Sequence, residues 1–248
     1  MYTALNGRRL YYEVHGPAAG PPVVLLHHGL GAVEAWENTA PALSEAGFRV
    51  ILYARWGYGR SDPRPGLDIP VFRDDQEDLL ALLDRLEIER ANLVGHSDGA
   101  TIALRFAARH RERLCRLAVI APHVYLEPRM ASGMADVQEA YRENSRFQEG
   151  MRRLHGEMAD SVFSNWYNGW LKPENRNWDM RPELKRIACP VLVVQGCEDE
   201  HTEPRHARET AANIPGAELW LVDGAAHMLP QDLPEVFNPR LLEFLTGA

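Results

Sequence analysis

A five-residue segment, Gly95-His96-Ser97-Asp98-Gly99, is the feature that most constrains the fold of this 248-residue chain. It follows an apolar run over residues 91–94 and precedes a helix-like stretch over residues 100–110. In a strand–turn–helix of this kind the serine occupies a strained turn, and the flanking glycines let the strand and helix backbones approach closely. The turn places the Ser97 hydroxyl near the positive end of a helix dipole. The pattern predicts a nucleophile elbow, with an ordinary surface turn as the alternative.

Apolar runs alternate with helical patterns along most of the chain. An edge strand is predicted over residues 9–14, and buried strands over residues 23–26, 48–53, 91–94, 114–121, 190–196 and 217–222. Runs that are apolar at every position suit strands covered on both faces, and their alternation with helices predicts a mainly parallel, doubly wound α/β sheet. We assign residues 1–122 and 187–248 to this core.

Composition changes over residues 123–186, which contain no strand-like run. We expect this segment to form inserted helices that act as a lid over the C-terminal edge of the sheet, where open α/β folds bind ligands. His155 lacks a spaced partner and is interpreted as a surface or packing residue. The aromatic side chains either line a substrate pocket or attach the lid to the core; they are Phe163, Trp166, Tyr167, Trp170 and Trp178.

Two predicted helices of the core are distinguished by an internal proline and by a cluster of carboxylates. A helix over residues 34–46 contains Pro41, so it is expected to be bent or split into two pieces. A second helix over residues 71–86 is amphipathic, and its N-terminal half carries Asp74, Asp75 and Asp78. We interpret these carboxylates as a solvated helix face.

Composition and charge narrow the class of partner. A net charge of −8 argues against nucleic acid or an anionic membrane, and a 45% hydrophobic content is enough for a substantial core. With no apolar signal segment or membrane span, the protein is expected to be cytoplasmic, as a monomer or homodimer. The cysteines, Cys115, Cys189 and Cys197, lack metal-ligand spacing and are expected to be reduced packing thiols, so no metal is predicted.

Two further polar residues follow later predicted strands. Asp199 comes after the strand that ends at Gly196, and His227 lies in the turn after the last strand. A serine nucleophile needs a base with a pKa near 7, and that base needs a carboxylate to orient it. Each residue also has a purely structural explanation: Ser97 as part of a turn, Asp199 as a helix cap and His227 as a loop histidine. Together, in the order Ser97, Asp199, His227, they predict a catalytic triad.

These motifs resemble those of the α/β-hydrolase fold family along nearly the whole chain. The resemblance implies that Ser97 is the nucleophile, Asp199 the acid and His227 the base, and that the backbone N–H groups of Leu30 and Asp98 form the oxyanion hole. Glu198 and Glu200 flank the acid, but the family spacing favours Asp199. Ala54 and Trp56 depart from the family pattern. The similar segments are His28-Gly29, Arg55-Trp56-Gly57-Tyr58-Gly59-Arg60-Ser61, residues 95–99, residues 196–199 with Pro204, and residues 224–227.

The Ser-Asp-Gly elbow resembles that of valacyclovir hydrolase-like members of the family, in which an acidic side chain helps to attract a substrate's amino group. The resemblance implies amine recognition by Asp98, with neutralisation by a neighbouring arginine or backbone donor as the alternative. His28 is a further candidate, either for binding substrate or for fixing its loop. The predicted substrate-binding residues are Asp98, His28, Trp166, Trp170 and Met228.

The sequence therefore predicts a carboxylesterase-like serine hydrolase that cleaves small-molecule esters through an acyl-enzyme intermediate, without a cofactor or metal. Hydrolysis of a carbon–carbon bond, a lactone or an amide by the same triad is an alternative. Outside catalysis, the alternative is a ligand receptor that retains the fold but does not turn over its ligand.

Overall fold

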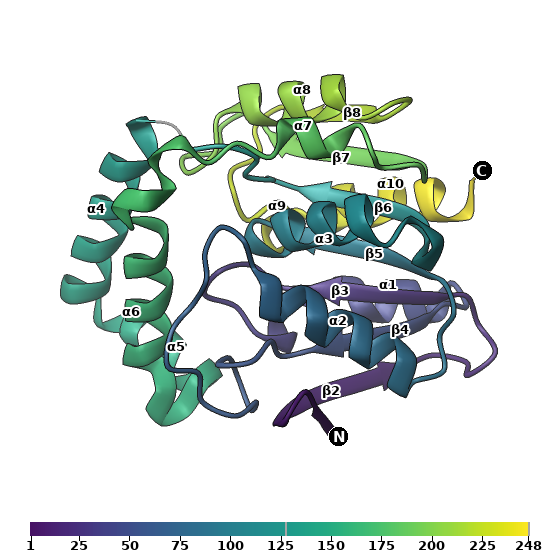
Figure 1. Cartoon of the computed structure of the whole chain (residues 1–248), viewed down its shortest axis with the longest axis horizontal. Coiled ribbons are helices and arrows are strands. Elements are labelled where there is room, and N and C mark those ends of the chain that lie inside the picture. The colour runs from purple at the N-terminus through teal and green to yellow at the C-terminus, as the bar shows by residue number, and fades with distance from the viewer. Residues whose placement is uncertain (127, 248) are drawn as a thin grey trace.

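An eight-stranded sheet forms the centre of the computed structural model, which describes residues 1–126 and 128–247; Glu127 of the predicted lid and Ala248 of the predicted core lie outside the described residues (Figure 1). The strand order is β1-β2-β4-β3-β5-β6-β7-β8. Pairing is antiparallel for β1 with β2 and for β2 with β4, and parallel from β4 to β8. The strands are β1 (Tyr2–Leu5), β2 (Arg8–His15), β3 (Pro22–Leu26), β4 (Arg49–Tyr53), β5 (Ala91–His96), β6 (Leu114–Ile120), β7 (Val191–Gly196) and β8 (Glu218–Val222). The predicted doubly wound α/β sheet is confirmed.

The prediction that residues 9–14 form an edge strand is wrong. β1 pairs outside β2, with Tyr2 opposite Tyr11, so β2 is an interior strand. Alternate residues of β1, Thr3 and Leu5, are buried while their neighbours are exposed. Four residues with two inward side chains give a weak alternation signal, which explains why this strand was missed.

Helices cover both faces of the sheet. On one face α2 (Arg73–Arg85), α3 (Asp98–Arg109) and α8 (Pro204–Asn213) pack in one apolar cluster; on the other, α1 (Thr39–Glu45) and α10 (Pro234–Thr246) pack in a second. Neighbouring residues of one strand therefore enter different clusters, as Leu93 and Val94 do. This two-sided burial explains why the parallel strands are apolar at every position.

The predicted break near Pro41 is confirmed. A short 3-10 turn (Val33–Trp36) is followed by the separate helix α1, in which Pro41 occupies the third position. A proline is tolerated in the first turn of a helix because the N–H groups there have no acceptor within the helix. The two pieces lead the chain from β3 to β4.

Between β6 and β7 the chain forms helices that lie together beside the sheet (Figure 1). We call residues 123–186 the lid; its boundaries remain a prediction. Its main helices are α4 (Pro128–Glu143), α5 (Ser145–His155) and α6 (Ala159–Trp170), with the short α7 (Arg181–Leu184) near its end. Met134, Met151 and Phe163 belong to the same apolar cluster as α2 and α3, so apolar packing is continuous from core to lid. Within the described residues, no helix combines the length and apolar character required to cross a bilayer.

Candidate active site

Ser97 lies in the turn that joins β5 to α3. Its backbone has φ of 55° and ψ of −117°, a conformation that costs on the order of 1–3 kcal/mol for a residue with a side chain. A Cβ atom at Gly95 would collide with the carbonyl group of Gly99, and one at Gly99 would collide with the carbonyl group of Leu26. The two glycines therefore permit the close strand–helix approach that was predicted from the motif.

Asp199 and His227 are brought together from the ends of β7 and β8. The His227 ring donates a hydrogen bond from Nδ1 to Oδ2 of Asp199 over 2.8 Å. Because an ionised carboxylate accepts but does not donate, Nδ1 carries the proton and Nε2 keeps a lone pair for a proton from elsewhere. Of the three neighbouring acids, Asp199 is the one that orients the ring, whereas Glu200 accepts a bond from the His227 backbone N–H over 3.3 Å.

Additional donors hold the Asp199 carboxylate in place. Oδ1 accepts from the backbone N–H groups of His201 and Thr202, each over 2.8 Å, and Oδ2 accepts from Gln195 over 2.6 Å. Burial alone would raise the pKa of Asp199, but its bond to His227 and those two N–H groups lower the pKa to about 2. The sequence analysis did not single out Gln195. An amide that follows four apolar residues in a buried strand could have indicated a polar partner for Asp199.

Ser97 and His227 line one cavity of about 630 Å³ at the C-terminal ends of the strands. Four predicted substrate-binding residues also line it, namely His28, Trp166, Trp170 and Met228. Side chains from the lid complete an apolar wall that includes Met134, Val137, Phe147, Met151 and Leu154. Other aromatic residues pack within the lid instead: Phe163 stacks on Tyr141 with ring centroids 3.9 Å apart, and Trp178 packs against Trp170.

The loop after β3 carries the predicted oxyanion donor Leu30. The Leu30 N–H points to Nδ1 of His28 at 3.4 Å, a long hydrogen bond. Burial lowers the pKa of His28 to about 3, helped by the nearby His227 and Arg55, so this ring is neutral and Nδ1 accepts. The second predicted donor, Asp98, is the first residue of α3 and its N–H has no acceptor within that helix. His28 both lines the cavity and fixes its own loop.

The Asp98 side chain is buried next to the cavity wall rather than exposed in it. It is 1% exposed and is not among the described residues that line the cavity wall. Trp170 donates from Nε1 to Oδ1 over 3.1 Å, and the Arg55 guanidinium lies 3.9 Å from Oδ2. Burial raises the pKa of Asp98 to about 6, an effect that Arg55 and Trp170 partly offset. The geometry thus favours neutralisation by an arginine over the recognition of a substrate amine.

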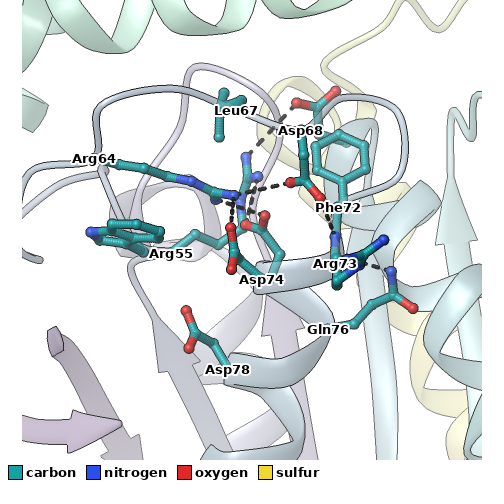
Figure 2. Close-up of polar contacts among 12 residues, drawn as sticks. Arg55, Arg64, Leu67, Asp68, Phe72, Arg73, Asp74, Gln76 and Asp78 are labelled. Atoms are coloured by element: carbon teal, nitrogen blue, oxygen red, sulfur yellow. Dashed lines mark hydrogen bonds and ion pairs between the residues drawn. The ribbon is translucent and has the colours of Figure 1, made fainter. Parts of the chain in front are cut away.

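The interpretation of the α2 carboxylates as a solvated face is wrong for two of them. Asp75 and Asp78 are each 1% exposed, while Asp74 is partly exposed. Asp75 accepts from Arg55 over 3.3 Å and from Arg64 over 2.8 Å, and these cations lower the pKa of Asp75 although burial alone would raise it. Figure 2 shows Arg64 beside Asp68 and Asp74, to which it also donates. Asp78 accepts two bonds from Arg8. These buried acids pair with arginines from other segments of the chain. The residue pattern of the helix alone does not predict such pairs.

The buried ion pairs lie directly beneath the loop after β3. We call Arg55, Arg64 and Asp75 the arginine network. Besides contacting Asp75, Arg55 donates from Nη2 to the carbonyl oxygen of His28 over 3.2 Å. The same carbonyl accepts from Nδ1 of His27 over 2.8 Å. The core therefore holds the loop through the backbone of His28.

Comparison with known proteins decides the family. A family model described as alpha/beta hydrolase fold matches residues 21–155, more than half of the chain. The chain belongs to this family. The resemblance seen in the motifs is thus confirmed at the level of the family, and the chain is an alpha/beta hydrolase.

Relatives of this alpha/beta hydrolase carry several activities in their names. "Putative carbamate hydrolase RutD" of Caulobacter sp. strain K31 is 31% identical, over 96% of each chain. Among solved structures, the enol-lactonase from Burkholderia xenovorans LB400 is 27% identical with a TM-score of 0.78, covering 99% of this chain and all of that one. Carboxylesterase CesB from Bacillus subtilis is 25% identical with a TM-score of 0.79, covering all of this chain and 91% of that one.

Proposed function

We propose that this protein is a serine hydrolase that cleaves small carboxylic esters through an acyl-enzyme intermediate. Ser97 is the nucleophile, His227 the general base and Asp199 the residue that orients the base. The observation that carries the proposal is the hydrogen bond between Asp199 and His227, with the ring of His227 and Ser97 lining one apolar cavity. A serine alcohol needs a base of this kind to become a competent nucleophile.

The reaction follows from the protonation states of the site. His227 accepts the Ser97 proton at Nε2 while Oγ attacks the ester carbonyl, and the anionic Asp199 stabilises the imidazolium. The tetrahedral oxyanion accepts hydrogen bonds from the N–H groups of Leu30 and Asp98. His227 then protonates the leaving alcohol. A water molecule, deprotonated by His227 in turn, releases the carboxylic acid and restores Ser97.

Two observations support an ester as the substrate. The lid contributes Met134, Phe147 and Met151 to the cavity wall, which suits an apolar acyl or alcohol group. The names of the three relatives refer to a carbamate, an enol-lactone and a carboxylic ester, in each of which a heteroatom leaves an acyl carbon. The similarity to an enol-lactonase makes a lactone, a cyclic ester, the second candidate. Amine recognition in the manner of valacyclovir hydrolase-like enzymes is not part of the proposal, because Asp98 is buried against Trp170.

Hydrolysis of short p-nitrophenyl esters tests this function. Ser97→Ala should lower kcat by about 10⁴-fold or more, because the nucleophile is lost. The matched control is Ser164→Ala on the exposed surface of α6, which should keep the kcat of the unmodified protein. An unchanged kcat in Ser97→Ala would contradict the proposal. Stabilisation by an ester without any turnover would favour the receptor alternative instead.

A further inference from the structure

His155, the last residue of α5, connects the lid to two segments of the core. It is 3% exposed, and its Nδ1 accepts a hydrogen bond from the Gly59 N–H over 2.9 Å. Because Nδ1 accepts, the ring proton resides on Nε2, which lies 3.0 Å from the carbonyl oxygen of Leu30 and donates to it. The sequence interpretation as a surface or packing residue omitted both bonds.

A second contact on Leu30 helps to orient its N–H, because the 3.4 Å bond from this N–H to Nδ1 of His28 is long and therefore weak. Gly29 and Gly31 flank Leu30, and glycine has more backbone freedom than any other residue. The carbonyl and N–H groups of Leu30 are joined through one Cα atom, so fixing the carbonyl restricts the rotation of the residue that carries the N–H. Donors that are already oriented stabilise an oxyanion better than donors that must reorganise.

We propose that His155 is a positioning residue that sets the direction of the oxyanion-hole N–H of Leu30 from the lid. The proposal rests on the proposed function, because it requires Leu30 to be an oxyanion donor. Arg55 holds the carbonyl of His28 from the core side of the same loop. The loop is therefore held by a core side chain and by a lid side chain.

A directional role can be separated from packing by two amides of similar size. In His155→Gln the side-chain amide nitrogen can take the place of Nε2 and donate to Leu30. In His155→Asn the shorter side chain retains an acceptor near Gly59 but does not reach Leu30. A residue that merely fills space beside Tyr58, whose ring lies 6.0 Å away, would be replaced about equally well by either amide.

The decisive experiment measures kcat and KM for p-nitrophenyl acetate with His155→Asn and His155→Gln. We expect His155→Asn to lower kcat by about 10- to 100-fold with KM changed less than about threefold, since oxyanion contacts act in the transition state. His155→Gln should retain kcat within about threefold, given that its donor to Leu30 is kept. His15→Asn, at an exposed position in β2, is the matched control.

Equal losses of kcat in the two variants, or an unchanged kcat in His155→Asn, would overturn the proposal. If the unmodified protein shows no Ser97-dependent turnover, the proposed function fails, and the contact itself is tested by amide hydrogen exchange of a peptide covering residues 28–31. Faster exchange in His155→Asn than in His155→Gln supports the tether to Leu30. Identical exchange in both variants and the unmodified protein refutes it.

Discussion

The sheet positions the proposed catalytic side chains through backbone pairing, whereas the lid reaches the site through individual side chains. Ser97, Asp199 and His227 follow β5, β7 and β8, whose registers are fixed by parallel ladders. Several lid side chains donate to core groups, among them His155 to Leu30, Asn165 to the carbonyl of Arg64, Trp170 to Asp98, and Asn175 to the carbonyl of Ile69. Substitutions at strand ends should therefore abolish chemistry, while those in the lid should tune it.

The largest effect is expected at the end of β7. Asp199→Asn should lower kcat by about 10⁴-fold, because an amide in place of the carboxylate favours the wrong tautomer of His227. The measurement is steady-state hydrolysis of a p-nitrophenyl ester. Glu200→Gln is the matched control, since Glu200 contacts the backbone N–H rather than the ring of His227. A larger loss in Glu200→Gln than in Asp199→Asn would contradict the assignment of the acid.

The next effect concerns stability of the core. Asp75→Ala leaves the buried guanidinium groups of Arg55 and Arg64 without their shared carboxylate, and breaking such a buried pair costs about 3–5 kcal/mol. Denaturant unfolding measures this free energy. In the control, Asp84→Ala removes a largely exposed partner of Arg113 and should cost less than about 1 kcal/mol. Similar losses of the free energy of unfolding in both variants would show that the arginine network contributes no more to stability than a surface ion pair.

A pH effect is expected at Asp98, where core and lid meet. Folding raises the pKa of this carboxyl from its ordinary 3.8 to about 6, so the folded state binds the proton more tightly than the unfolded chain. The contribution of Asp98 to stability is therefore complete below about pH 4 and is lost as the pH rises through about 6. A shift of this size corresponds to a loss on the order of 3 kcal/mol.

Comparison with Asp98→Asn isolates this effect, because the amide keeps an oxygen for the Trp170 indole but does not titrate. The free energy of unfolding of the unmodified protein, minus that of the variant, should fall between pH 4 and pH 6.5 and stay constant above. A difference that does not change with pH, or that rises with pH, would contradict the raised pKa of the Asp98 carboxyl.

The smallest effect is expected in the lid wall of the cavity. Phe147→Ala removes apolar surface from the lid wall of the cavity, so kcat/KM for an octanoyl ester should fall by about tenfold relative to that for an acetyl ester. Leu171→Ala, an exposed lid residue outside the cavity wall, should leave the ratio unchanged. A uniform loss for both esters would argue that Phe147 supports the fold rather than acyl selectivity.

The contrast between core and lid also separates what the sequence could predict from what it could not. Local signals in the sequence predict the elbow, the alternation of strands and helices, and the order of Ser97, Asp199 and His227. These signals are enough to predict one site, because the ends of parallel strands meet at one edge of the sheet. The arginine network and the bonds of His155 join residues 11 to 125 positions apart. No periodicity encodes such pairs. For the same reason, the sequence could not distinguish Trp166 in the cavity wall from Phe163 in the lid packing.

Covalent modification of Ser97 tests the central claim most directly. The protein is incubated with a fluorophosphonate ester, which reacts with activated serines, and its intact mass and modified peptide are determined by mass spectrometry. The account predicts one adduct per chain, located on Ser97, and its loss in Ser97→Ala together with much slower formation in Asp199→Asn. An adduct that still forms in Ser97→Ala would contradict the account. So would a protein with Ser97 that gains no adduct on prolonged exposure and yet hydrolyses esters.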